Sequence, residues 1–254
     1  MIRSGLTKHV CLLAAAAVVS SGIGLSAKAG PKSVEQVTAD LKRIAPLIPA
    51  GYELALKYRV KTPEDVVLLS DSYAFADFDG NGTGDVAVVL EQIPTYQNVP
   101  GVGTVLRHGS RRLAIFEGQN DGSYELVGQN DELVLRGDEG GSGDPFDGLS
   151  LTAQGSLRLD SYGGRGRSHW SSTYTFQHRE IAGRTGYLYL VGYALSEEDG
   201  GGNHDEVHDY MTGRLEKTVL LFDAATDEMI GKPTVTVTNE GRKPLVSLSD
   251  VKRP

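Results

Sequence analysis

The chain has 254 residues, with 33 acidic against 25 basic side chains and a formal net charge of −8. An acidic surface of this kind argues against binding to nucleic acid or to anionic membranes. The length suits one all-β domain or two small ones, and no segment after the N-terminus is apolar enough to cross a membrane.

Residues 1–29 have the pattern of a signal peptide. Arg3 and Lys8 form a basic start, residues 10–19 form an apolar core too short to span a bilayer, and residues 27–29 give a small-x-small cleavage site. We therefore expect a periplasmic or secreted protein. Cleavage would remove Cys11, the single cysteine, and would leave 33 acidic against 22 basic residues, a net charge of −11. The mature chain would then fold without disulfides.

One short helix is expected over residues 33–45. Ser33 and Gln36 form a capping box at its start, and the prolines that follow end it. Its apolar residues recur at helical spacing, at Val34, Val37, Leu41 and Ile44. Residues 52–60 and 66–72 are expected to form strands.

The most informative segment is residues 77–85. Aspartate or asparagine occupies positions 1, 3, 5 and 9, glycine fills positions 4, 6 and 8, and a buried strand is expected over residues 86–90. Calcium takes about six to eight oxygen ligands in a flexible shell, and alternate residues of a curled loop can point inward together. We therefore predict a calcium site formed by the side chains of Asp77, Asp79, Asn81 and Asp85 and the backbone carbonyl of Thr83.

Electrostatics favours a cation in this loop. At about 4 Å and an effective dielectric constant of ~20, each pair of carboxylates repels by about 4 kcal/mol, and a divalent ion reverses that sign. The loop is not an EF-hand, because position 12 is Val88 rather than a bidentate glutamate. The alternative is a tight Asp/Asn/Gly turn between two strands, without an ion.

The segment 73–90 resembles an FG-GAP or VCBS repeat, the calcium-loop blade of integrin-type β-propellers. That family has the pattern D-x-D-x-[DN]-G-x-x-D, which is matched here at Asp77, Asp79, Asn81, Gly82 and Asp85. Residues 113–127 resemble the hairpin that closes such a blade, and the whole resemblance covers roughly residues 72–127. It implies a structural calcium ion and a propeller-like sheet.

The second half of the chain is expected to be antiparallel β structure. Residues 137–148 form a loop rich in Gly and Asp, so we predict one region over residues 30–148 and a second over residues 149–254, with a single continuous domain as the alternative. Short motifs here resemble uncharacterised exported bacterial β proteins, a family without a settled activity. These motifs are Thr173–Phe176, Gly192–Tyr193 and the turn Tyr210–Gly213.

Four local expectations follow in this half. Period-two alternation places Trp170 on one strand face with Tyr174 and Phe176, toward the core. A glycine-rich acidic loop is expected over residues 197–206, a late strand over residues 234–238, and a loosely ordered polar tail from Arg242 onward. The sequence thus predicts an all-β fold of antiparallel sheets, propeller-like or sandwich-like, with one short N-terminal helix.

Two other segments contain residues that are typical of functional sites. His204 and His208 are spaced as in a zinc peptidase, but Asp205 follows the first histidine where that motif needs glutamate, and the segment is not helical. Residues 163–170 place two arginines, a histidine and Trp170 on a loop that suits either a carboxylate or sugar ligand or an ordinary hairpin turn.

The sequence favours an exported, non-enzymatic β protein with one structural calcium loop, acting as a binding module for a protein or glycan partner. The alternative is an envelope hydrolase that uses His204, His208 and acidic residues, or a Ser-His-Asp triad that sequence cannot reveal. No nucleic-acid partner is expected.

Overall fold

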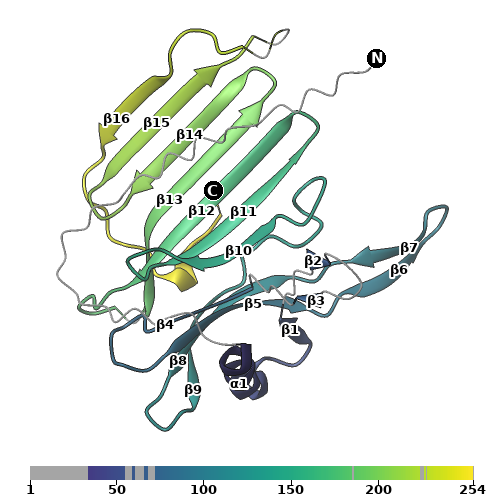
Figure 1. The fold of residues 1–254 in the computed structure, drawn as a ribbon, viewed down its shortest axis with the longest axis vertical. Coiled ribbons are helices and arrows are strands. Elements are labelled where there is room, and N and C mark those ends of the chain that lie inside the picture. Colours follow the sequence, from purple (N-terminus) through teal and green to yellow (C-terminus); the bar gives the residue numbers. More distant parts are fainter. Residues whose placement is uncertain are drawn as a thin grey trace.

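A computed structural model describes residues 34–54, 59–60, 66–67, 72–184, 186–223, 226 and 228–253. The expected signal peptide with Cys11 lies outside these residues, as does most of the segment 55–71, of which only the short strands β2 (Arg59–Val60) and β3 (Val66–Val67) are described. The described chain is all-β, with antiparallel sheets and one short α-helix, as the sequence predicts (Figure 1).

The first sheet has five strands and is built around β5, which is buried over almost its whole length. Two short strands, β1 and β4, share one side of β5; β8 and then β9 lie on the other side. The strands are β1 (Tyr52–Leu54), β4 (Tyr73–Ala76), β5 (Asp85–Gln92), β8 (Arg111–Gly118) and β9 (Tyr124–Asn130).

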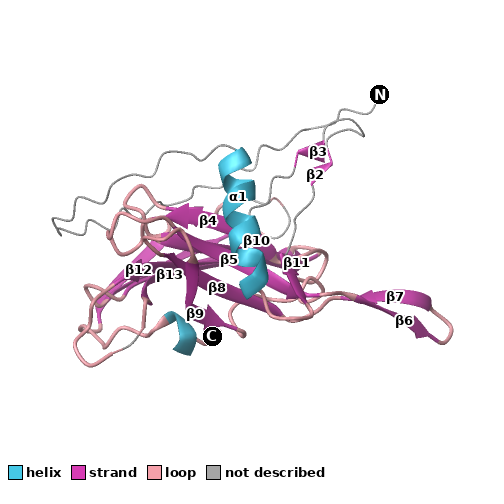
Figure 2. Cartoon of the chain, turned by 90° about the horizontal axis from the view of Figure 1, so that it is seen from below, coloured by secondary structure: helices cyan, strands magenta, loops and turns pink. Residues whose placement is uncertain are grey.

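Helix α1 (Val34–Ile44) covers one face of this sheet. Figure 2 shows it crossing the strands, and a 3-10 turn, η1 (Ala45–Leu47), follows it. Ile44 is fully buried against the side chains of β5 and β8 that alternate toward the helix, and these are Val86, Val88, Leu90, Ala114 and Phe116. The helical spacing in the sequence therefore reflects packing on a sheet.

The second sheet has seven strands in strict chain order, each antiparallel to the next. Its inner strands pack on the face of the first sheet opposite to α1, where Ala87, Leu113 and Ile115 meet Leu157 and Phe176 in one core. The strands are β10 (Phe146–Leu151), β11 (Leu157–Arg165), β12 (Ser168–His178), β13 (Leu188–Asp199), β14 (Gly202–Asp209), β15 (Arg214–Leu221) and β16 (Thr234–Asn239). Residue 148, the expected boundary, lies inside β10.

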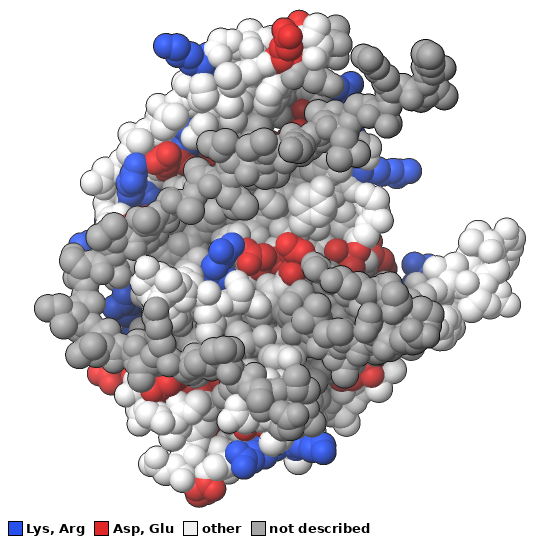
Figure 3. All heavy atoms as spheres, in the orientation of Figure 1, with Lys and Arg blue, Asp and Glu red and all other residues white. Residues whose placement is uncertain are grey.

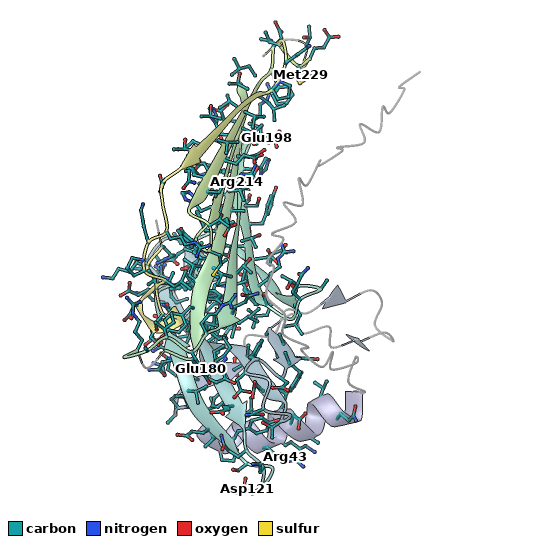
Figure 4. The ribbon with its side chains drawn as sticks, turned by 90° about the vertical axis from the view of Figure 1, so that its left-hand side faces the viewer. Arg43, Asp121, Glu180, Glu198, Arg214 and Met229 are labelled. Carbon is teal, nitrogen blue, oxygen red and sulfur yellow. The ribbon has the colours of Figure 1, made fainter. Side chains whose placement is uncertain are left out.

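Among the described residues, no second layer covers the outer part of this sheet. Figure 4 views it nearly edge-on, with Met229 at its far end and Arg43 and Asp121 at the opposite end of the molecule. All six residues of β16 are exposed, whereas β12 alternates between buried and half-buried positions. The inner strands of this sheet thus contribute to the core, whereas its outer strands are accessible on both faces.

A buried ionic network connects the two sheets. Arg111 on β8 is 4% exposed and donates to both carboxylate oxygens of Asp144 at 2.6 Å and to Glu91 on β5 at 3.1 Å. Nδ1 of His108 lies 3.1 Å from the other oxygen of Glu91. Burial alone would lower the pKa of Arg111, but the hydrogen bonds and charges of Asp144 and Glu91 raise it, so the guanidinium stays charged.

The expected acidic loop over residues 197–206 is wrong. This stretch contains the end of β13 and the start of β14, joined by a tight turn at Gly200 and Gly201. Asp199 accepts the backbone NH groups of Gly201 and Gly202 at 2.8 and 3.0 Å, which closes the hairpin. The glycine run therefore forms a turn of two residues, and the acidic residues belong to strands.

The expectation of a loosely ordered tail is also wrong. A 3-10 turn, η2 (Leu248–Asp250), buries Leu248 and Val251, which are 2% and 5% exposed. The amide of Asn130, at the end of β9, donates to the carbonyls of both residues at 2.7 and 2.8 Å. The tail is thus tied to the first sheet.

A separate hairpin, β6 (Thr95–Val99) and β7 (Gly103–Arg107), extends away from the body of the molecule (Figures 1 and 2). Tyr96 and Val102 are 77% and 74% exposed on it. In the described part of the chain, no helix has the length and apolar character needed to span a membrane.

Candidate metal centre

The loop over residues 77–85 joins β4 to β5 at one end of the five-stranded sheet. Gly80 and Gly82 adopt positive φ angles of 79° and 88°, which side-chain-bearing residues rarely take. These two glycines let the chain curl so that its alternate residues turn inward. The nine-residue spacing in the sequence is therefore realised as a compact loop between two paired strands.

The loop brings three carboxylates together. Asp77, Asp79 and Asp85 each offer an oxygen, and these oxygens lie within 4.8 Å of one another. Ligand oxygens at about 2.3–2.6 Å from a calcium ion lie at most about 5 Å apart, so the three fit one common centre. Among the described residues, no other group of three such side chains meets this distance test.

Asn81 and Thr83 lie beside the three carboxylates. The Asn81 amide NH₂ donates to Asp79 at 3.0 Å, and its carbonyl oxygen accepts the backbone NH of Thr83 at 2.7 Å. The hydroxyl of Thr83 lies 2.6 Å from the carbonyl of Gly118 on β8. All five residues of the predicted site are thus gathered in one loop, and Thr83 also ties the loop to the neighbouring strand.

Asp85 also has a structural role in the core, which Asp77 and Asp79 lack. It is fully buried, and its two oxygens accept from the backbone NH of Phe78 at 2.7 Å, the backbone NH of Gly118 at 3.0 Å and the hydroxyl of Tyr187 at 2.9 Å. Tyr187 precedes β13, so this carboxylate connects the loop, β8 and the second sheet. A Cβ at Gly118 would meet the carbonyl oxygen of Gly84 at 2.3 Å, so the close approach needs glycine.

Glu117 on β8 is a further acidic residue at the loop, which sequence reasoning missed. Its carboxylate lies 3.4 Å from the amide nitrogen of Asn81. No motif signals it, because it stands 36 residues away and reaches the loop only through the pairing of β5 with β8. A cation in the loop would therefore have a fourth carboxylate nearby.

Burial and the charges of neighbouring carboxylates raise the pKa values of Asp85 and Glu117. Loss of hydration raises the pKa of Asp85 above its usual value, despite the three hydrogen bonds that it accepts, and the charge of Asp79 adds to the effect. The pKa of Glu117 is raised by burial and then by the charges of Asp79 and Asp85. A cation bound in the loop would lower the pKa values of both Asp85 and Glu117.

The hydroxyl of Tyr187 supports the loop from the second sheet. Replacing Tyr187 with Phe removes its hydrogen bond to Asp85, and we expect a loss of about 1.5–3 kcal/mol, the usual range for a hydrogen bond to a charged group. Urea unfolding in the presence of EGTA measures the change without metal effects. The control is Tyr162→Phe, since that hydroxyl is exposed beside His169. Equal losses in the two variants would contradict the role of Tyr187.

The structure does not bring His204 and His208 into a metal site. Both lie on β14, four residues apart, so they share a face at a separation of about 13 Å. His208 stacks near Tyr193 and Tyr210 and lies 3.5 Å from Glu206, whereas His204 pairs across the ladder with Glu197. The two histidines that suggested a zinc site are therefore residues of one strand, too far apart to bind one ion.

Trp170 is only half-buried, which corrects the expectation that it faces the core. It shares its strand face with Tyr174 and Phe176, but it lies beyond the first sheet and packs on the backbone of Gly163. With Glu197 and other residues it lines an open hollow of about 510 Å³. The segment 163–170 is the ordinary hairpin that the sequence allowed: β11 and β12 run through it and turn at Gly166 and Arg167.

Comparison of this chain with models of protein families, with curated proteins and with solved structures finds no match. The site is therefore interpreted from its own geometry.

Proposed function

We propose that this protein is a non-enzymatic binding module of the periplasm or the extracellular space, with a structural calcium ion in the loop between β4 and β5. The observation that carries the proposal is the convergence of the Asp77, Asp79 and Asp85 oxygens within 4.8 Å. The four strands β4, β5, β8 and β9 lie side by side, as in a propeller blade, which agrees with the FG-GAP resemblance.

The position of the loop favours a structural ion over a catalytic one. Asp85 holds the loop against β8 and against Tyr187 of the second sheet, so binding there strengthens a junction between sheets. A calcium ion would be held by the carboxylates of Asp77, Asp79 and Asp85, with Asn81, Thr83 and Glu117 alongside. Its charge would offset the burial and, to a lesser extent, the repulsion by Asp79 that raise the pKa of Asp85.

The outer part of the seven-stranded sheet is the proposed surface for a protein or glycan partner. The connection from β15 to β16 exposes Leu221, Met229 and Ile230 to 51%, 51% and 55%, and the backbone NH of Ile230 donates to Leu221. Contiguous exposed apolar side chains of this kind are typical of interaction surfaces. On the face seen in Figure 3, the described basic side chains are scattered among acidic ones.

Calcium is expected to stabilise the fold. At 100 times the dissociation constant, binding adds about 2.7 kcal/mol, and extracellular modules bind calcium at about 0.1–1 mM. Thermal unfolding should therefore shift upward in millimolar calcium and return with EGTA. Asp79→Ala should abolish the shift. Asp121→Ala, which removes an exposed carboxylate from the next hairpin, should retain it. An Asp79→Ala protein with the full shift would refute the site.

The partner surface has a separate test. The protein should retain a partner from envelope extract, and the double variant Met229→Glu, Ile230→Glu should lose it. Val102→Glu, a change at an even more exposed apolar position on the β6–β7 hairpin, is the control. If both variants retain the same partners as the unmodified chain, the partner does not bind the outer sheet. For the alternative hydrolase, His204 and His208 lie too far apart on β14 to share a metal ion.

A further inference from the structure

Strand β16 is the last strand of the seven-stranded sheet, and no described strand lies beyond it (Figure 1). All six of its residues are exposed, including Val235 and Val237, each 55% exposed. Its pairing with β15 is regular from end to end, without a bulge.

One backbone hydrogen bond shows which backbone groups of β16 face outward. The NH of Glu240 donates to the carbonyl of Gly213 at 2.8 Å, one step beyond the paired residues Asn239 and Arg214. In an antiparallel ladder hydrogen-bonded and non-hydrogen-bonded pairs alternate. Thr236 therefore bonds inward to β15, and Val235 and Val237 present their NH and carbonyl groups at the open edge.

This edge lacks the usual protection against pairing. Sheet edges are normally blocked by charged side chains, proline, bulges or a covering segment. The strand reads Thr-Val-Thr-Val-Thr-Asn, with no charge or proline within it, and Pro233 stands just before it. An open edge with two outward-facing valines is suited to adding another strand.

We propose that β16 pairs with β16 of a second copy of this chain, antiparallel about a two-fold axis through Thr236. Residues 234–238 form a palindrome about Thr236. In this register Val235 lies opposite Val237 of the second copy, and Thr234 lies opposite Thr238, so like side chains share each face. Pairing about this axis gives hydrogen-bond partners to the outward NH and carbonyl groups of Val235 and Val237 in both copies. The two seven-stranded sheets then become one continuous sheet.

The flanking charges support the same register. Two residues before the strand, Lys232 falls opposite Glu240 of the second copy, and the two-fold axis repeats this pair at the other end. Opposite charges at both ends match this arrangement, which a shifted register would lose. The palindrome and the charge pattern are the reasons to assign a second copy rather than an unrelated peptide. The inference does not depend on calcium.

A disulfide on the axis tests the geometry. Across the edge, Thr236 forms a non-hydrogen-bonded pair with itself, with Cα atoms about 4.5 Å apart, within the range that disulfides span. Thr236 is exposed, so cysteine fits without repacking. In the full chain carrying Cys11→Ser, mild oxidation of Thr236→Cys should give a covalent dimer on non-reducing gels.

Thr238→Cys is the matched control, on the same strand and the same face. Its Cα would lie about 13 Å from its counterpart, too far for a disulfide. A dimer from Thr236→Cys and none from Thr238→Cys supports the proposal. Equal cross-linking of both variants, or none from either, overturns it. The mass measured by light scattering should also rise with concentration in the unmodified chain, and a constant monomer mass overturns the proposal.

Charge reversal provides a second test outside the strand. Lys232→Glu or Glu240→Lys alone places like charges opposite each other and should weaken the dimer, whereas the double variant should restore it. Restoration supports the register. Weakening that the double variant does not reverse contradicts it, and a stable monomer that captures only unrelated peptides assigns the edge to another partner.

Discussion

Arg111→Ala is expected to lower the free energy of unfolding by about 3–5 kcal/mol, the usual cost of breaking a buried ion pair. The guanidinium is nearly inaccessible and carries four hydrogen bonds, two to Asp144, one to Glu91 and one to the carbonyl of Leu135. Without the guanidinium, the carboxylates of Glu91 and of Asp144, which lies just before β10, lose the cation that they share. Denaturant unfolding, followed by far-ultraviolet circular dichroism, measures the loss.

The neighbouring Arg112 offers a matched control. It stands on the same strand but points to the opposite face of the sheet, where its side chain is 16% exposed, pairs with the half-exposed Asp131 and lies 5.0 Å above the ring of Tyr52. Arg112→Ala should cost less, about 1 kcal/mol, because Asp131 stays in contact with water and no buried charge is left unpaired. Comparable losses for the two arginines would contradict the part assigned to the buried network. Glu91→Gln in the Arg111→Ala background should recover part of the loss, because it removes an uncompensated charge.

Asp85→Ala is expected to destabilise the metal-free protein by about 3–5 kcal/mol, because it leaves two backbone NH groups and one hydroxyl without their acceptor in a buried position. Unfolding in EGTA isolates this loss from any effect of calcium. The result would show that the last residue of the loop supports the fold as well as the proposed ion.

Asp77→Ala is the comparison within the same loop. Its carboxylate accepts the backbone NH groups of Gly80 and Gly82, but these bonds are exposed to solvent, so we expect a loss of about 1 kcal/mol in EGTA. In calcium, both variants should lose the stabilisation by the ion. If Asp85→Ala unfolds no more easily than Asp77→Ala without metal, the buried hydrogen bonds of Asp85 contribute little.

Local patterns predicted the elements that local interactions determine. Helix α1 and strand β5 follow from residue spacing within about ten residues, and the structure contains both. The loop geometry was predictable for the same reason, since alternating ligands and glycines lie in one short segment. Whether calcium occupies it stays a prediction.

Features that depend on strand pairing could not be predicted. Glu117 and Tyr187 reach the loop from 36 and 102 residues away, and nothing in their own neighbourhoods signals it. Asn130 ties down the tail across a separation of 118 residues, so a polar sequence was mistaken for loose structure. The glycine run at residues 200–202 suggested a long loop, because composition does not distinguish a tight turn from an extended one.

The single-layer outer sheet has a consequence for local opening. Each strand from β14 outward is held mainly by the strand before it, since the shared core contains few side chains beyond β13. Successive hairpins can then open one at a time from the free end, without global unfolding. In the monomer, at concentrations too low for two copies to pair, amide hydrogen exchange should show a gradient, slowest in β11 and β12 and fastest in β16. The strands that are accessible to a partner are thus also the strands whose local opening costs the least free energy.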